Sequence, residues 1–567
     1  MIQLDTEIRM CDVLVVGGGI AGLMAAIAAA DSGADVIVAE KCHTRRSGAG
    51  CTGNDHFLCY LPEIHGSLER FVRECMMTQV GFSTEERMLR VFAARSQAIV
   101  ERWHKWGINM KTGEGGTYRF EGHAFPGRMR THLKYDGKKQ KEVLNREAVR
   151  RGVRLENKTA VLEYLQDDTG HICGALALDA SKEVPVLRLF RAKSLISATG
   201  AGNRIYSATT PNYMFNIAGD PVNVGSGMVA CYRCGASLLS MDTPRLTAGP
   251  RYLERAGKAT WIGVLRDYHG QNLGPFVEKP SREHGDITAE IWPGVFRDKQ
   301  ADGSGPVYMD CTELSPEDQE YLRYAFACEG DTSLIESLDT QGVDLTRHMV
   351  EFGSYENTLL GNGIEVDTVG ATGVPGLYAA GDCLGNLTAT IAGAAVMGDV
   401  AGAAAAAHAT QMPPLEVNLR DHPKVAEWSR FCTTLIERKE GGNWEELNIA
   451  VNQIMDDYCS AYALRSDTLL SAGLNNLEII RRRALEHVCC ANAHELVRAL
   501  EAFDILELAK IILLSAKTRT ETRGLHRRAD YPFTNPLLNQ TFVSVRCENG
   551  TDILSIRPIN PPPCEEN

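Results

Sequence analysis

The chain has 567 residues, which is too long for one compact core and predicts roughly two to four domains. Its net charge of −13 argues against nucleic-acid binding through a basic surface, and its 17 cysteines are scattered and do not form a disulfide framework. No uninterrupted apolar run reaches the roughly 20 residues that span a bilayer. The glycine motif described next begins too near Met1 to leave room for a signal peptide. These features predict a cytoplasmic protein without direct membrane insertion.

The first informative stretch is a buried strand, a glycine turn and an alanine-rich helix. Val13–Val16 is continuously apolar, as in a parallel strand, and residues 23–30 follow as the helix. A second strand, residues 35–39, ends in Glu40. The turn has the G-x-G-x-x-G spacing, which allows a sharp turn, close approach of a pyrophosphate and tight helix packing. We therefore predict a dinucleotide site, with Glu40 accepting hydrogen bonds from the adenosine ribose. Its glycines are Gly17, Gly19 and Gly22.

Two later segments are candidates for ligand contact. Residues 41–54 are rich in glycine and small side chains, which allow backbone to run close to a ligand; an ordinary flexible loop is the alternative. Residues 122–132 concentrate cationic and titratable groups, among them His123 and His132. A solvated basic loop explains this second segment equally well.

The remaining pattern predicts a dinucleotide domain that is interrupted once. Residues 195–200 form another buried strand with a glycine turn, and residues 376–382 repeat that pattern before a small-residue helix. Cys231 and Cys234 form a CxxC pair, but no second pair has matching spacing, so we expect no metal site. The expected domains are 1–240 and 355–415 for the two parts of the nucleotide domain, 241–354 for an inserted α+β domain, and 416–567 for a helical domain with a polar, proline-rich tail.

Several separated motifs together resemble the flavoprotein subunit of the fumarate reductase/succinate dehydrogenase superfamily. They are the glycine turn at 17–22, residues 46–49, 197–200 and 377–382, and the closing segment 521–532, whose sequence is ETRGLHRRADYP. Residues 246–261 look most like the alpha subunit of adenylylsulfate reductase. The resemblance covers nearly the whole chain. It implies an α/β fold: a Rossmann-type FAD-binding domain interrupted by an α+β capping domain and followed by a C-terminal helical domain.

The resemblance also implies a set of site residues. Arg251 matches a substrate arginine, Asn54 an asparagine near flavin N5, and His123, His132 and His269 are candidate proton carriers. The helix N-terminus at 393–395 is expected to stabilise anionic reduced flavin at the pyrimidine edge. The implied FAD-binding residues are Gly17, Gly19, Gly22, Glu40, Lys41, Ser47, Gly48, Ala49, Ala160, Ala198, Thr199, Gly200, Asp382, Gly393, Ala394 and Ala395.

Three departures from the family pattern shape the functional hypothesis. Gly48 stands where membrane-bound fumarate reductases attach FAD to histidine, so we expect non-covalent FAD. Residues 386–393 lack the proton-donating arginine of the dicarboxylate enzymes, and residues 358–363 replace their substrate-binding His-x-Thr-x-Gly-Gly motif. Without cations there, buried dicarboxylates would be left unpaired, which argues against a plain fumarate reductase.

The leading hypothesis is an FAD-dependent oxidoreductase that acts at flavin N5 on a small anionic substrate. Because the sequence has neither an NAD fingerprint nor an Fe–S ligand set, electrons are expected from an external carrier, and the resemblance implies a ferredoxin-like iron–sulfur partner. The alternatives are an electron-transfer subunit with a vestigial pocket, a fumarate-reductase-like ene reductase, and a free-standing oxidase.

Overall fold

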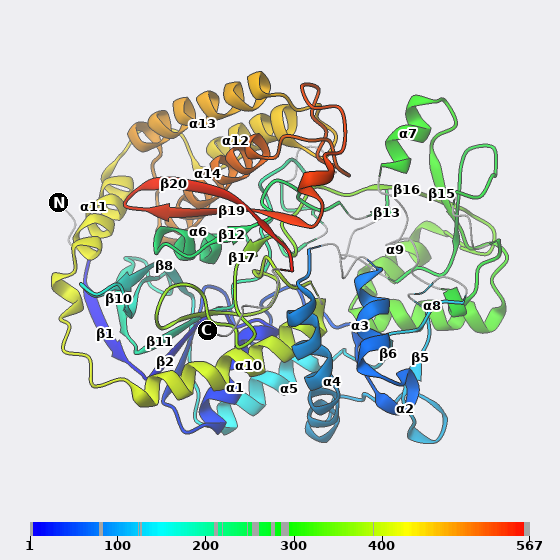
Figure 1. The fold of residues 1–567 in the computed structure, drawn as a ribbon, viewed down its shortest axis with the longest axis horizontal. Coiled ribbons are helices and arrows are strands. Elements are labelled where there is room, and N and C mark those ends of the chain that lie inside the picture. The colour runs from blue at the N-terminus through cyan, green and yellow to red at the C-terminus, as the bar shows by residue number, and fades with distance from the viewer. Residues whose placement is uncertain are drawn as a thin grey trace.

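The structure, a computed structural model, is an assembly of an α/β body, a second smaller α+β lobe and a group of C-terminal helices (Figure 1). In Figure 1 the smaller lobe, in green, lies to one side of the body, α12–α14 lie above the body, and α11 lies along its left edge. The structure describes residues 4–78, 83–122, 124, 127–208, 214–217, 219–246, 248–251, 260–273, 278–284, 294–388 and 390–560.

A five-stranded parallel sheet organises the body. Its order is β18-β11-β2-β3-β7, and β2, the buried strand Val13–Val16, is central. Both the strand and the following helix are confirmed: α1 spans Ile20–Asp31 and is buried along most of its length. The remaining strands are β3 (Val36–Glu40), β7 (Arg154–Asn157), β11 (Ser194–Ser197) and β18 (Leu377–Ala379).

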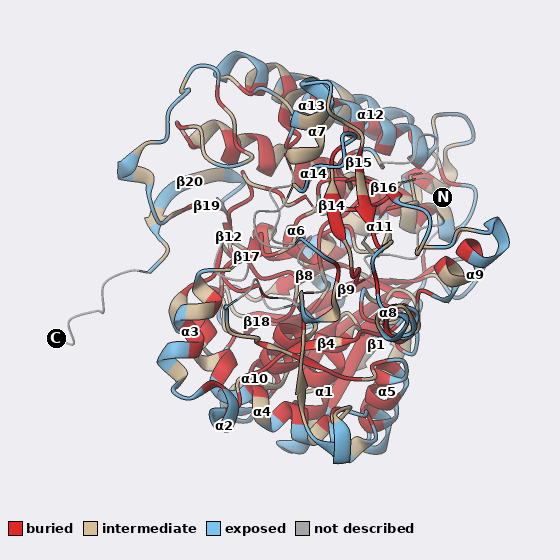
Figure 2. Cartoon of the chain, turned by 90° about the vertical axis from the view of Figure 1, so that its right-hand side faces the viewer, coloured by how far each residue is buried: buried red, intermediate tan, exposed pale blue. Residues whose placement is uncertain are grey.

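Helix α10, Thr390–Gln411, packs closely on α1 in the interior of the body (Figure 2). A Cβ atom on Gly398 would lie 2.4 Å from the carbonyl oxygen of Ala21, and one on Gly402 would lie 2.2 Å from that of Ala25. Among the described residues, α10 is the helix long and apolar enough to cross a membrane by length and composition. In that apolar window 61% of the residues are buried inside the protein, as in a core helix.

Smaller elements complete the body around this sheet. A four-stranded sheet of order β1-β10-β9-β8 lies beside it, and a three-stranded sheet β4-β6-β5 carries residues that reach the site described below. The elements are β1 (Thr6–Met10), β4 (His56–Leu58), α2 (Pro62–His65), α3 (Leu68–Met76), α4 (Glu86–Trp106), β5 (Arg119–Phe120), β6 (His132–Lys134), α5 (Gln140–Arg150), β8 (Thr159–Gln166), β9 (Ile172–Asp179), β10 (Val186–Arg191) and α6 (Ser226–Arg233).

The smaller lobe has its own hydrophobic core, which contains Trp261, Met309, Phe326 and Phe352. A sheet of order β13-β16-β15-β14 packs with helices α8 and α9 around this core. The domain limits stated above remain predictions. The lobe's elements are β13 (Ala248–Pro250), β14 (Val264–Arg266), α7 (Val295–Ala301), β15 (Val307–Asp310), α8 (Pro316–Glu329), α9 (Thr332–Gln341) and β16 (Val350–Ser354).

The C-terminal part is helical, as expected, but its last segment is more than a surface tail. Strands β19 (Thr541–Glu548) and β20 (Thr551–Pro558) form a hairpin, and β19 pairs with β12 of the body. The alternating residues Val543 and Val545 are fully buried on one face of β19, and Phe542 is buried on the other, which explains why a polar-looking tail forms a strand. The other elements are β12 (Leu238–Leu239), β17 (Gly363–Ile364), α11 (Pro423–Glu437), α12 (Trp444–Cys459), α13 (Asp467–His487) and α14 (Ala493–Thr518).

Candidate active site

A cavity of about 810 Å³ opens at the carboxyl ends of the parallel strands, beside the glycine turn. This is where open α/β sheets bind their ligands. The wall combines segments that are far apart in the sequence: the glycine turn, the 40–54 loop, the start of α10, the turn between α8 and α9, and α14. The predicted site residues that line it are Gly17, Gly19, Glu40, Lys41, Ser47, Gly48, Ala49, Asn54, Ala160, Ala198, Thr199, Gly200, Asp382 and Ala394.

The glycine turn has the geometry that its spacing predicts. A Cβ atom on Gly22 would lie 1.8 Å from the Gly17 carbonyl oxygen, so this position allows close packing of α1 on the turn. A Cβ atom on Gly19 would meet nothing within 4 Å, which leaves space at the cavity wall. Gly22 itself lies outside the cavity lining, as do Gly393 and Ala395 on α10.

Polar groups of the wall fit a dinucleotide. The Glu40 carboxylate accepts hydrogen bonds from the backbone N–H groups of Gly18, at 2.6 Å, and Cys42, at 2.7 Å, which orient it at the end of β3. Ser47 Oγ and Thr199 Oγ1 are buried and have no hydrogen-bond partner among the described residues. Because buried hydroxyls are normally bonded, these two atoms are suited to a ligand.

A buried lysine supports the glycine turn from behind. Lys141 donates a hydrogen bond to the carbonyl oxygen of Gly18. Burial lowers the pKa of its ammonium to about 8, although the nearby Glu40 carboxylate opposes the shift. Lys141 therefore adds a positive charge close to the predicted pyrophosphate position.

The C-terminal helix α14 closes one side of the cavity through Glu501. This carboxylate pairs with Lys41 at 2.7 Å, Arg204 at 3.0 Å and Arg498 at 2.7 Å. Burial would raise the pKa of Glu501, but the three cations outweigh it and lower the pKa to about 2. The cavity is therefore completed by a segment more than 450 residues after the glycine turn, as the 460-residue separation of Lys41 and Glu501 shows.

Arg245 lines the cavity and places a positive charge there. It lies six residues before Arg251, the arginine that the sequence analysis predicted to contact the substrate. The Arg245 guanidinium donates to Ser83 Oγ at 3.3 Å and to Thr388 Oγ1 at 3.2 Å. Burial lowers the Arg245 pKa to about 10, and Asp382 across the cavity opposes this shift. Thr388 belongs to the segment that lacks the family arginine, so the structure supplies a cation there from elsewhere in the chain.

Of the other predicted catalytic residues, Arg251, His269 and His132 lie outside the cavity lining, whereas Asn54 is part of it. Arg251 lies outside the cavity lining, at a smaller cavity with Phe296, and contacts Glu351 at 3.3 Å. His269 lies in a loop that is also outside the lining, where its backbone N–H donates to Asp267. His132 lies on β6 with its ring 5.5 Å from that of His56, and His123 falls outside the described residues.

A hydrogen-bonded cluster that sequence reasoning missed lines the cavity near Asn54. Asp55 accepts from Lys134 Nζ at 2.6 Å and contacts His56 Nδ1 at 2.6 Å. Glu329, at the end of α8, accepts from the backbone N–H of Thr260 at 2.6 Å, and the Thr260 hydroxyl links the two carboxylates. Burial would lower the pKa of Lys134, but Asp55 outweighs it and raises the pKa. Asp55, His56 and Glu329 lie close enough together to hold a metal ion, but the Lys134 ammonium already contacts Asp55.

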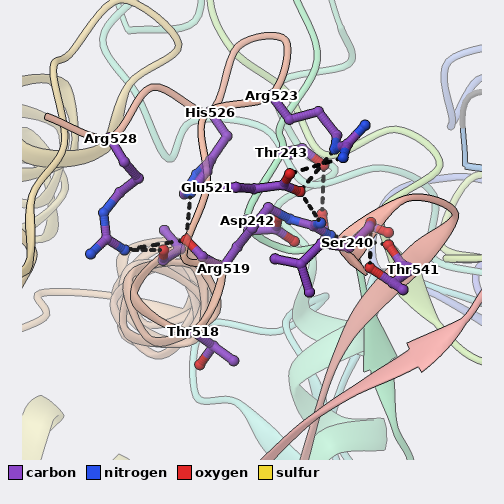
Figure 3. Close-up of polar contacts among 12 residues, drawn as sticks. Ser240, Asp242, Thr243, Thr518, Arg519, Glu521, Arg523, His526, Arg528 and Thr541 are labelled. Atoms are coloured by element: carbon purple, nitrogen blue, oxygen red, sulfur yellow. Dashed lines mark hydrogen bonds and ion pairs between the residues drawn. The ribbon is translucent and has the colours of Figure 1, made fainter. Parts of the chain in front are cut away.

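The closing sequence motif anchors the segment that carries Arg245 (Figure 3). Arg519 Nε contacts Asp242 at 2.5 Å, and its Nη1 contacts Glu521 at 3.1 Å. His526 Nδ1 accepts from Arg465 at 2.6 Å while its Nε2–H donates to the Arg519 carbonyl at 3.0 Å. Burial and then the Arg465 charge lower the His526 pKa to about 3, which keeps the ring neutral. Asp242 precedes Arg245 by three residues, so this network holds the arginine-bearing segment.

Comparison with known proteins agrees with this geometry. A family model described as "FAD binding domain" matches residues 12–262, and one described as "Fumarate reductase flavoprotein C-term" matches residues 449–564. One subunit of the fumarate reductase (CoM/CoB) of Methanothermobacter marburgensis is 24% identical, over 94% of this chain and 96% of that one.

Solved structures show the same fold at similar coverage. Adenylylsulfate reductase from Archaeoglobus fulgidus superposes with a TM-score of 0.84 at 20% identity, covering 98% of this chain and 96% of that one. Escherichia coli quinol fumarate reductase superposes with a TM-score of 0.81 at 20% identity, and the superposition covers 98% of this chain and 98% of that one. The Rossmann-type FAD-binding fold with a C-terminal helical part is thereby confirmed. The chain is an FAD-dependent oxidoreductase of the fumarate reductase/succinate dehydrogenase flavoprotein family.

Proposed function

We propose that the chain binds FAD non-covalently and exchanges electrons between it and a small anionic substrate held by Arg245. The observation that carries this proposal is the position of Arg245: its guanidinium lines the FAD cavity and is anchored on Thr388 and Ser83. A guanidinium in this position can bind a carboxylate, sulfate or phosphate group of a ligand. Relatives are named for fumarate and a structural neighbour for adenylylsulfate, and both compounds are anions, which supports this substrate class.

Other groups of the cavity have distinct proposed roles. Asn54 donates from Nδ2 to the His56 carbonyl at 2.9 Å, which fixes its amide beside the cavity. His56 and Glu329 line the cavity near Asn54. Gly48 has no side chain that could form a flavin bond, which supports non-covalent FAD. When bound, FAD supplies two-electron chemistry at N5.

The test of this proposal is a titration of the FAD-loaded protein with adenylylsulfate, fumarate and sulfite, followed by flavin difference spectra. At least one of these anions should perturb the flavin spectrum of the wild-type protein. We expect Arg245→Gln to weaken that binding by about 30-fold or more, because removing one partner of a buried ionic contact costs about 2 kcal/mol or more.

Arg251→Gln is the matched control, because Arg251 lies outside the cavity lining and pairs with Glu351. Its effect on anion binding should stay within about twofold. The proposal is contradicted if Arg245→Gln retains wild-type affinity, or if none of the three anions alters the flavin spectrum.

We further propose that an iron–sulfur partner delivers the electrons. Several relatives are named as flavoprotein subunits, which supports a complex. The described cysteines are dispersed through the chain as free thiols, so an iron–sulfur centre is expected on another polypeptide. Purification from the native source should yield a second, smaller chain and visible absorbance beyond that of flavin. A pure flavoprotein with rapid reoxidation in air would instead support the free-standing oxidase.

A further inference from the structure

The region where α8 ends and α9 begins brings two carboxyl groups of the smaller lobe, those of Glu329 and Asp331, to the FAD cavity. Gly330 in the turn between these helices packs against the 40–54 loop. A Cβ atom added to Gly330 would lie 2.4 Å from the Thr52 carbonyl oxygen. In the same contact, a Cβ atom added to Gly53 of the loop would lie 2.2 Å from the carbonyl oxygen of Cys328. Side chains are excluded at both positions, so the turn contacts the loop through backbone. Asp331 follows directly and lines the cavity.

The Asp331 carboxyl is buried, and its Oδ2 makes no hydrogen bond within the part of the chain that the structure describes. The residue is only 2% exposed. Asp331 occupies the N-cap of α9, but its side chain does not make the capping hydrogen bond that aspartate normally makes there. Burial raises the pKa of this carboxyl to about 7. Since unpaired buried carboxyls are costly, one that faces a ligand cavity indicates a role with the ligand.

Most other carboxyl and imidazole side chains that line the cavity have a hydrogen-bond or ion-pair partner. His56 contacts Asp55, and Glu329 accepts from Thr260. The remaining pairs follow the same pattern: Asp382 faces Arg245, Asp504 contacts Arg233 at 3.3 Å, and Glu501 contacts Lys41, Arg204 and Arg498. Glu40 and Asp220 accept hydrogen bonds from backbone N–H groups instead. Asp331 differs from these carboxyls because its buried Oδ2 has no hydrogen-bond partner among the described residues.

We propose that Asp331 is a redox-linked proton carrier, which takes up one proton at Oδ2 when the bound FAD is reduced and passes it to the substrate when FAD is reoxidised. This inference rests on the proposed FAD chemistry. The N-terminal end of α10, with Thr390 and Ala394 at the cavity, favours an anionic reduced flavin that has gained two electrons and one proton. The negative charge raises proton affinity nearby, so Asp331 stores the second proton.

Electrons and protons balance in this proposed step. An external electron donor of the iron–sulfur class supplies two electrons, and solvent supplies two protons, one for flavin N5 and one for Asp331. The substrate then gains a hydride from N5 and a proton from Asp331 Oδ2. Asp331 returns to its carboxylate form, and FAD returns to its oxidised form.

The experiment measures the midpoint potential of bound FAD against pH, by dye-coupled reductive titration without any substrate. Each proton taken up with two electrons shifts the potential by about 30 mV per pH unit. In the wild-type protein the slope should double as pH rises through about 7, because Asp331 is already protonated below that value. Asp331→Asn should keep the smaller slope from pH 5 to pH 9.

Controls separate this role from a structural one. Asp331→Glu retains a carboxyl and should restore the doubled slope, while Asp504→Asn alters a buried, ion-paired carboxyl of the same cavity and should leave the slope as in the wild type. Asp331→Ser, which also caps a helix, replaces Asp331→Asn if that variant loses FAD. An unchanged doubled slope in an FAD-loaded variant without the carboxyl overturns the proposal. That result leaves anion binding by Arg245 unaffected, because the spectral titration tests it separately.

Discussion

Replacing Arg519 by methionine should lower the free energy of unfolding by about 3–5 kcal/mol, because it leaves the buried Asp242 carboxylate without its cation and leaves Glu521 with Arg523 alone. The Asp242 and Glu521 side chains are both fully buried, and Arg519 lies between them (Figure 3). Urea unfolding of the FAD-loaded protein, followed by circular dichroism, measures the change. Anion binding through Arg245 should weaken in the same variant, since Asp242 anchors its segment.

Arg481→Met is the matched control, because Arg481 pairs with Glu478 on α13 with both side chains about half exposed, at 45% and 48%. Exposed pairs of this kind contribute about 0–1 kcal/mol. If the two variants unfold at the same urea concentration, the buried network does not have the stabilising role assigned to it.

Glu501→Gln should cost about 3 kcal/mol of stability near pH 7 and weaken FAD binding. The estimate follows from the fall in the Glu501 pKa from 4.5 to about 2, at about 1.4 kcal/mol per pH unit. Because the folded-state pKa is lowered, the contribution is fully present above pH 4.5 and is lost as pH falls towards 2. The difference between variant and wild type should therefore shrink over that acidic range.

Urea unfolding at several pH values checks the stability, and fluorescence of released flavin checks cofactor binding. Glu478→Gln, at the exposed pair on α13, provides the control and should change both by little at any pH. If Glu501→Gln lowers the free energy of unfolding by the same amount at every pH, packing, and not the ion cluster, accounts for the loss of stability.

The local signals in the sequence predicted the nucleotide-binding core well. The continuous valine run indicated β2, and the glycine spacing indicated the turn before α1, since both depend on neighbouring residues. The hairpin β19–β20 was missed because its stability comes from pairing with β12, some 300 residues earlier along the chain.

Parts of the candidate site also depend on contacts between segments far apart in the sequence, which local sequence signals do not predict. Arg245 and Arg251 are six residues apart, and only the pairing of residue 245 with Thr358 turns one of them towards the cavity. His56 follows closely on the predicted Asn54, so extending that loop by two residues would have included it. Asp331 and Glu329 reach the cavity only through docking of the α8–α9 turn, for which the sequence has no local signal.

The contribution of α14 to the cavity also bears on the lifetime of the protein in a cell. A ligand that binds only the native state stabilises it by about 4 kcal/mol when present at a thousand times its dissociation constant. Because the FAD cavity needs both the glycine turn and α14, FAD adds this free energy to the docking of the C-terminal helices on the body. Chains synthesised during flavin shortage should therefore open more often at α14 and be degraded faster by proteases, so that flavin supply regulates the abundance of this enzyme as well as its activity.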